Sequence, residues 1–422
     1  MSKAKRTLEE FAAKRLVQIP KQTVWSEMTP LAAAHKAINL GQGFPSFAPP
    51  EFVTNHIAAA VTDPNAPLNH QYCRAFGHLE LVEPLRKIYA ERLQREIGQM
   101  ELLVTNGVTQ GLNLACQAFL GPEDELLSFE PYFDLYTNDV YLSSSNIQLV
   151  PMQTDDKLAN NWSFTEEALR AKITPRTKAI LVNTPQNVPG KVFRRDELEL
   201  IAKIAVEFDL LVFADEVYMT LVYDGAEHIS IASFPGMFDR TITMSSAGKT
   251  FSCTGYKIGW MVAPEPLIIA LAKVSANQTF CVATPLQIAI GRSLADATTN
   301  GYFQKLISIY EGKRELLVTA LKDAGLPVVM PAGGYFALAD ITGIDESHYV
   351  DPNDTTDVAK DWQFCRWLTK EIGVNAIPVT AFCRKETRPQ FEKFVRFAFC
   401  KKDEDIQEAG KRLQKLKEFT RK

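Results

Sequence analysis

The chain has 422 residues, of which 46% are hydrophobic and 23% charged, a composition typical of a folded globular protein rather than a disordered, collagen-like or coiled-coil chain. Lysine and arginine total 46 against 50 aspartates and glutamates, a net charge of −4, so no global positive field favours a nucleic-acid partner. Since no apolar run approaches the roughly 20 residues of a bilayer span, we also expect no membrane partner.

The N-terminal segment is basic, and Leu8, Phe11, Ala12 and Leu16 have helical spacing. An imported mitochondrial protein could begin in this way, but the acidic pair at 9–10 favours a cytoplasmic protein instead. The seven cysteines are odd in number and contain no C-x-x-C motif. We therefore expect reduced thiols and neither a disulfide framework nor a metal site.

Short apolar runs alternate with helical patterns between residues 75 and 245. These runs are apolar on both sides of the strand period, as expected for strands that are buried on both faces of a parallel sheet. The predicted strands are 101–105, 125–129, 147–152, 178–183, 210–215 and 241–246. The sequence therefore predicts an α/β fold with a mostly parallel sheet covered by helices.

The pattern changes after about residue 265. Long helices are predicted over 302–324, 357–371 and 403–418, with strands at 335–340 and 393–399 between them. We expect a smaller α+β domain to follow the large one. The predicted division assigns residues 1–45 to an N-terminal arm that shares the small domain, 46–305 to the large domain and 306–422 to the small C-terminal domain.

Two glycine patterns suggest nucleotide binding, but neither satisfies the known fingerprints. Residues 41–43 and 107–111 lack the G-x-G-x-x-G spacing, and the Gly248-Lys249-Thr250 run has Thr243 where a P-loop requires its first glycine. A nucleotide site is not supported, so Lys249 needs another explanation.

Polar groups follow three of the predicted strands. The turn at 105–109 precedes a helix, and the free N–H groups at a helix start suit a phosphate. Considered without the other motifs, this segment would more often be an ordinary capped turn between a strand and a helix. Asp215 ends an apolar strand, where a carboxylate is desolvated unless it meets a cation. Lys249 and Lys257 follow the next strand. Because the carboxyl ends of parallel strands meet at one sheet edge, these groups should lie together.

This arrangement resembles the fold-type-I pyridoxal-phosphate aminotransferases, and more narrowly the group of kynurenine aminotransferase, glutamine transaminase K and cysteine-conjugate β-lyase. The similarity extends from about Trp25 to the C-terminus. The motifs that carry it are INLGQGFPSF (38–47), QYCRAFGH (71–78), FEPYFDLY (129–136), NTPQNVPGKVF (183–193), ADEVY (214–218), SSAGKTFSCTGYKIGW (245–260) and FVRFAF (394–399). The large domain is then expected to contain the seven-stranded type of sheet found in aspartate aminotransferase.

The resemblance implies pyridoxal 5′-phosphate as cofactor and gives a role to each matching residue. Lys249 bonds covalently to its aldehyde, and Asp215 pairs with its ring nitrogen. Phe133 stacks on the ring, while Tyr218 and Asn187 hydrogen-bond its hydroxyl oxygen. The phosphate contacts come from Val108, Thr109, Ser246, Lys257, and Tyr72 of a neighbouring subunit.

The resemblance also implies a substrate site and a homodimer with shared active sites. Arg396 binds the substrate α-carboxylate with help from Gly43 and Asn187, and Trp25 lines the side-chain pocket. An arginine among the apolar residues of FVRFAF needs an anionic partner in any case, and its planar fork matches a carboxylate.

The chain departs from the family pattern in two places. Gln186 and Val188 replace a histidine and a proline of the usual Asn-Thr-Pro-His-Asn-Pro-x-Gly motif, and Cys281 follows Phe280 in the loop expected near the neighbour's pocket. A cis bond before valine would cost roughly 2.5–4 kcal/mol, so we expect a rebuilt turn in which the adjacent Pro189 takes up the change. These positions affect substrate choice more than cofactor binding.

The expected activity is transfer of an amino group from a large uncharged or aromatic L-amino acid to a 2-oxo acid by a ping-pong mechanism. Kynurenine, glutamine, phenylalanine and methionine are the expected donors. A cysteine-S-conjugate β-lyase, or another lyase or synthase on the same fold, is the alternative and would use the same cofactor residues. A regulator without catalysis is disfavoured because no DNA-binding module fits before Trp25.

Overall fold

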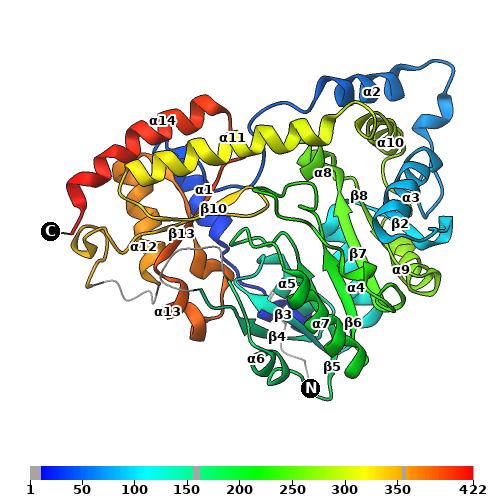
Figure 1. The fold of residues 1–422 in the computed structure, drawn as a ribbon, viewed down its shortest axis with the longest axis horizontal. Coiled ribbons are helices and arrows are strands. Elements are labelled where there is room, and N and C mark those ends of the chain that lie inside the picture. The colour runs from blue at the N-terminus through cyan, green and yellow to red at the C-terminus, as the bar shows by residue number, and fades with distance from the viewer. Residues whose placement is uncertain (1–10, 155–161, 354–357, 422) are drawn as a thin grey trace, which may run out of the picture.

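The computed structural model describes residues 11–154, 162–353 and 358–421 of the chain (Figure 1). Its largest element is a seven-stranded sheet with the strand order β2-β8-β7-β6-β5-β3-β4. The strands are β2 (Leu102–Thr105), β3 (Glu125–Glu130), β4 (Asn146–Pro151), β5 (Thr177–Asn183), β6 (Leu211–Asp215), β7 (Thr241–Ser246) and β8 (Gly259–Val262). The strands β7, β6, β5, β3 and β4 are parallel to one another, and β8 is antiparallel to both of its neighbours, β2 and β7.

The strands of this sheet are buried on both faces. Successive side chains point in opposite directions, so Val212 packs in one apolar cluster and Phe213 in the other. The six strands predicted from the sequence are confirmed, with shifts of a residue or so at their ends. The antiparallel β8 was not predicted, because its first two residues, Gly259 and Trp260, lie within a motif that we interpreted as loop.

Helices cover both faces of the sheet, and Figure 1 shows α4 and α5 near its centre and α3, α9 and α10 grouped at one end. The helices of this part are α2 (Glu51–Thr62), α3 (Leu79–Leu93), α4 (Gly107–Phe119), α5 (Leu135–Leu142), α6 (Glu166–Arg170), α7 (Arg195–Glu207), α8 (Ala247–Thr250), α9 (Glu265–Gln278) and α10 (Thr284–Ala297). The α/β prediction for the large domain is confirmed.

A smaller α+β part is built around a four-stranded sheet of order β12-β13-β10-β9. Figure 1 shows two of its helices, α11 and α14, side by side along its outer surface. Its elements are α11 (Tyr302–Asp323), β9 (Val328–Val329), β10 (Phe336–Asp340), α12 (Lys360–Trp367), β11 (Val374–Asn375), β12 (Ile377–Pro378), α13 (Arg388–Phe391), β13 (Phe394–Ala398) and α14 (Asp403–Leu413). The predicted helices and strands of this region are present, but 357–371 and 403–418 finish in π-helical and 3₁₀ turns.

The N-terminal segment joins this smaller part. Helix α1 (Val24–Ala34) begins at a capping box made by Thr23 and Ser26, and β1 (Ile38–Asn39) pairs in parallel with β11. Before it, Lys14–Gln18 form a single 3₁₀ turn, while Leu8 and the acids at 9–10 lie outside the described residues. The domain boundaries at residues 45 and 305 stay a prediction.

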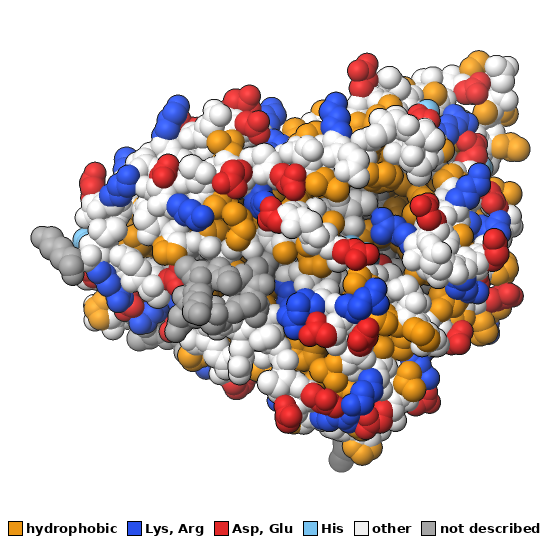
Figure 2. All heavy atoms as spheres, viewed as in Figure 1, with side chains coloured by type: hydrophobic (Ala, Val, Ile, Leu, Met, Phe, Trp, Pro, Cys, Tyr) orange, Lys and Arg blue, Asp and Glu red, His pale blue; other side chains and the backbone are white. Residues whose placement is uncertain are grey.

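Among the described residues, no helix combines the length and the apolar character needed to cross a membrane. Acidic and basic side chains are interspersed over the face shown in Figure 2, without a field of a single sign.

Candidate active site

A cavity of about 420 Å³ lies at the carboxyl ends of β5, β6 and β7, the usual ligand position in such sheets. It brings together the residues singled out from the sequence, with one exception. Its lining includes Trp25, Gly43, Val108, Thr109, Phe133, Asn187, Asp215, Tyr218, Ser246, Lys249, Lys257 and Arg396. The exception is Tyr72, which is 82% exposed and does not line the cavity of its own chain.

Lys249 lies on the short helix α8 directly after β7. Its Nζ donates a hydrogen bond to the Tyr335 hydroxyl at 2.6 Å, and that hydroxyl donates to the carbonyl oxygen of Gly43, also at 2.6 Å. Burial lowers the pKa of the Lys249 amine to about 8. An appreciable share of this amine is therefore neutral, and nucleophilic, near physiological pH.

Asp215 is the last residue of β6, and its carboxylate is held from two sides. The Tyr136 hydroxyl donates to Oδ2 at 2.6 Å and the backbone N–H of Val217 donates to Oδ1 at 3.2 Å. Burial raises the pKa of Asp215, whereas the hydrogen bond from Tyr136 opposes that rise. A buried carboxylate in this position is best satisfied by a cationic N–H group of a ligand.

The first turn of α4 and Lys257 form a cradle for an anion. Gly107 begins the helix with a φ of +74°, and a Cβ at this position would lie only 3.2 Å from the Lys257 Nζ. A Cβ on Gly259 would lie 2.6 Å from the Gly107 Cα, so the backbones approach too closely for a side chain there. Because free N–H groups of a helix start and an ammonium converge here, the cradle suits a phosphate.

Arg396 lies on β13 and is 1% exposed. Its guanidinium is stacked on the rings of Phe336 and Phe382, with its central carbon 4.0 and 4.7 Å from their centroids. It donates to the side-chain oxygen of Asn187 at 2.9 Å and to the carbonyl of Gly41 at 3.1 Å, both uncharged acceptors, while its buried Nε has no hydrogen-bond partner among the described residues. Burial lowers its pKa to about 10, so the guanidinium stays charged and suits an incoming carboxylate.

The turn that carries Asn187 is closed by backbone hydrogen bonds. Gln186 donates to the carbonyl of Lys191 at 2.7 Å and accepts from the N–H of Gly190 at 2.9 Å. In the described residues the cis peptide bonds are Glu130–Pro131 and Thr184–Pro185, so both peptide bonds of Val188 are trans. The turn does without a cis bond before Val188, as expected, but the expectation that Pro189 takes up the change is wrong, because the Val188–Pro189 bond is trans as well. That Asn187 reaches a ring oxygen stays a prediction.

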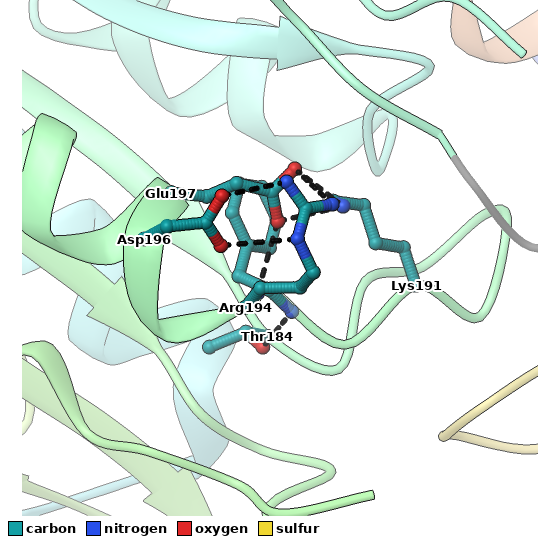
Figure 3. A network of polar contacts seen from close by, with 6 residues as sticks. Thr184, Lys191, Arg194, Asp196 and Glu197 are labelled. Atoms are coloured by element: carbon teal, nitrogen blue, oxygen red, sulfur yellow. Dashed lines mark hydrogen bonds and ion pairs between the residues drawn. The ribbon is translucent and has the colours of Figure 1, made fainter.

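A polar network fixes this turn to α7, as Figure 3 shows. The Lys191 ammonium donates to both carboxylate oxygens of Glu197 at 2.8 Å, and the two side chains are buried. The Phe193 N–H donates to the Thr184 hydroxyl at 3.1 Å. The Gln186 amide that replaces the usual histidine donates to the carbonyl of Pro131 at 2.9 Å. The substituted turn is therefore held firmly on both sides.

Two tyrosines of the site, Tyr136 and Tyr335, were missed from the sequence. Tyr136 stands in the motif quoted for Phe133, and its donor role toward Asp215 depends on the fold of α5 against β6. Tyr335 directly follows Gly333-Gly334 at the start of β10. That glycine pair before a strand was the available signal, because adjacent glycines allow close approach of another chain segment.

The predicted substrate-pocket residue Trp25 is held by a third missed residue, Asp134. The indole N–H donates to Asp134 Oδ2 at 2.7 Å, and the indole ring lies 6.2 Å from that of Phe382. The wall beside Arg396 is thus largely aromatic and contains one carboxylate already engaged with the indole.

Comparison with known proteins gives consistent matches over nearly the whole chain. The sequence profile described as Aminotransferase class I and II matches residues 35–413. Human kynurenine--oxoglutarate transaminase 3 is 39% identical, over 96% of this chain and 90% of that protein. The crystal structure of Bna3p from Saccharomyces cerevisiae superimposes with a TM-score of 0.92 at 33% identity, covering 97% of this chain and 99% of the other. The structure of YbdL from Escherichia coli, described as having a methionine aminotransferase function, superimposes with a TM-score of 0.85 at 30% identity, covering 96% of this chain and 99% of the other.

Proposed function

The chain belongs to the class I and II aminotransferase family, is an enzyme that uses pyridoxal 5′-phosphate, and, we propose, transfers the amino group of large uncharged or aromatic L-amino acids to a 2-oxo acid. The observation that carries this proposal is the convergence of Lys249, Asp215, the Lys257 cradle and Arg396 on one cavity. The preferred donors are of the kynurenine, phenylalanine, methionine and glutamine class.

The residues of the cavity fit the cofactor. Lys249 offers an amine whose pKa is lowered by burial, suited to an aldehyde. Asp215 offers a carboxylate for a protonated ring nitrogen. The space over Gly107 that a Cβ would fill, next to the Lys257 ammonium, suits the phosphate. Val108, Thr109 and Ser246 line the same side and are proposed to complete the phosphate contacts.

Bound pyridoxal phosphate supplies an aldehyde for the amino group and a ring that accepts electrons from the substrate Cα. The remaining roles, in binding the cofactor and moving protons, are proposed for residues of the chain. Asp215, whose carboxylate accepts hydrogen bonds from Tyr136 and Val217, would hold a proton at the ring nitrogen. With the cofactor bound, Phe133 would cover a face of its ring, and Tyr218 and Asn187 would donate to its ring oxygen. The Lys249 amine would then be the group that takes up the proton of the substrate Cα.

The substrate is held by its carboxylate and selected by its side chain. Arg396 donates two parallel hydrogen bonds to the α-carboxylate, and the backbone at Gly43 closes over it. Trp25 and Phe133 give the side-chain pocket an aromatic surface. Asp134 lies in the same wall, and a second carboxylate on the substrate would meet it unfavourably. Aspartate should therefore be a poor donor.

We further propose a cytoplasmic homodimer. Tyr72 is 82% exposed and Phe280 51% exposed, and the two rings meet edge to face with centroids 5.2 Å apart. Large exposed aromatic pairs of this kind are typical of interfaces. In the dimer Tyr72 would contact the partner's cofactor phosphate and Phe280 the partner's substrate pocket. All seven cysteines are free thiols, which suits a reducing compartment.

The proposal is tested by adding a panel of amino acids to the purified holoenzyme and following the cofactor absorbance and the products. Phenylalanine, kynurenine, methionine and glutamine should each convert the cofactor to its amine form and release the matching 2-oxo acid. A higher kcat/KM for aspartate than for phenylalanine would refute the substrate class. Release of pyruvate and ammonia from a cysteine S-conjugate, without transamination of the panel, would favour the lyase instead.

A further inference from the structure

Cys73 and Cys281 are two cysteines that the proposed activity does not use. They lie 208 positions apart in sequence, yet their side chains interact directly. Both are partly exposed, whereas the other five cysteines are buried: Cys116, Cys253, Cys365, Cys383 and Cys400. No other cysteine therefore combines access to a small oxidant with a neighbouring thiol.

The segments around the two thiols are held together by contacts on both sides. The residues that directly precede the two cysteines in the sequence are Tyr72 and Phe280, and their rings pack edge to face. After them, the side-chain amide of Gln287 donates to Cys73 Sγ at 3.2 Å and to the carbonyl of Val282 at 2.8 Å. The Thr284 hydroxyl also donates to the carbonyl of Gln71, at 2.6 Å. The two thiols are thus positioned by the fold rather than meeting by chance.

We propose that Cys73 and Cys281 are a redox-sensitive pair that forms an intrachain disulfide on exposure to hydrogen peroxide and is restored by a thiol reductant. The Cys281 thiolate attacks a peroxide oxygen, so that an S–O bond forms, the O–O bond breaks and hydroxide leaves to become water. Cys73 then loses its proton and attacks the Cys281 sulfur, forming the S–S bond and releasing a second water. Two sulfurs are oxidised and one peroxide is reduced.

The order of these two steps follows from the environments. Burial raises the pKa of the Cys73 thiol, which keeps it protonated and slow toward peroxide. Cys281 follows Phe280, whose φ of +64° turns the loop sharply, and it is partly exposed on the face of the subunit that the proposed dimer directs toward the partner's substrate pocket. Cys281 is therefore the thiol that reacts first, and Cys73 is the resolving thiol.

The disulfide should change the rim of the active site. An S–S bond of about 2.05 Å is much shorter than a non-bonded thiol contact, so Cys281 and its loop must move toward Cys73. The same loop carries Thr279, whose hydroxyl accepts a hydrogen bond from Gln110 on α4, the helix that begins the anion cradle. We expect kcat/KM for phenylalanine to fall by about three- to tenfold, less than the roughly 100-fold that misplacing a reacting group by 1 Å can cost.

The test is peptide mapping of the holoenzyme after mild peroxide treatment and alkylation of the remaining thiols. The expected product is one peptide pair containing Cys73 and Cys281, lighter by two hydrogen atoms and separated by dithiothreitol, with the lost activity regained. The matched controls are Cys73→Ser and Cys281→Ser, which should form no bridge and keep their activity after peroxide. Cys116→Ser controls for a buried cysteine and should behave like the unaltered enzyme.

Three results would overturn the proposal. They are a peroxide-treated protein in which both thiols still alkylate, a bridge between two subunits on a non-reducing gel, and irreversible sulfinic acid at Cys281 without a linked peptide. An unchanged kcat/KM in fully bridged enzyme would overturn the effect on the active-site rim.

Discussion

Replacing Arg396 by lysine tests the substrate site most directly, because it keeps the positive charge and removes the planar guanidinium with its paired N–H donors. In the structure the two terminal nitrogens donate to different acceptors, Asn187 and Gly41, and the planar group lies over the rings of Phe336 and Phe382. A lysine ammonium is a point charge that cannot match both oxygens of a carboxylate in this slot.

The magnitude follows from the hydrogen bond that is lost. A hydrogen bond to a charged group contributes about 1.5–3 kcal/mol, and each 1.36 kcal/mol is a factor of ten. Arg396→Lys should therefore raise KM by about 10- to 160-fold, and by similar factors for amino-acid and 2-oxo-acid substrates, since all share the carboxylate. Arg396→Ala should lose at least as much.

Steady-state kinetics with phenylalanine, methionine, glutamine and the 2-oxo acid phenylpyruvate measure this effect. The matched control is Arg314→Lys, the same change at another buried arginine, which pairs with Asp224 outside the cavity. Its KM values should stay unchanged even if its melting temperature falls. If Arg396→Lys raised KM only for substrates with one class of side chain, Arg396 would recognise the side chain rather than the carboxylate, and the reasoning would be wrong.

Three further predictions follow from the same site. Lys249→Ala should remain folded, as measured by circular dichroism. Its turnover should fall by more than the roughly 10²–10⁴-fold that proton transfer alone contributes, because the covalent attachment of the cofactor is lost as well. Near-normal transamination without added amines would contradict this. In the cofactor-free enzyme, burial lowers the Lys249 pKa to about 8, which favours the neutral amine. The rate of cofactor capture should therefore rise with pH and level off above about pH 8. A rise that continues to pH 10 would refute the lowered pKa. Mixing inactive Lys249→Ala subunits with inactive Tyr72→Ala subunits should restore part of the activity if Tyr72 serves the partner's site, since one site of each mixed dimer then carries neither change; no recovery despite proven subunit exchange would exclude sharing.

The sequence predicted the sheet edge well because its signals there are local. Asp215 and Lys249 each stand at or just after the end of an apolar strand, and parallel strands bring such ends together whatever the details of packing. The fold class and the cavity residues could therefore be placed in advance. Helix ends in the smaller part were less predictable, since the π-helical turn at Leu368–Ile372 continues the helical periodicity.

Contacts between distant segments were not predictable in the same way. The contact of Asn187 with the cofactor ring stays a prediction, whereas the hydrogen bond that its side-chain oxygen accepts from Arg396, 209 residues later, appears only in the structure. The direct contact between Cys73 and Cys281 likewise depends on how 71–73 packs against α10. Neither residue type nor spacing encodes such pairs, because they arise only when separate elements dock.

The Lys249 amine, which we propose to be the catalytic group, depends on both parts of the fold. Lys249 follows a strand of the large sheet, while Tyr335 precedes a strand of the smaller one and Gly43 belongs to the N-terminal segment. One chain of two hydrogen bonds, each 2.6 Å long, connects all three. Arg396 lies on the strand paired with the one that Tyr335 precedes, so the groups that hold the carboxylate and restrain the amine share one small sheet. A change in the position of that sheet would therefore alter substrate binding and the Lys249 environment together.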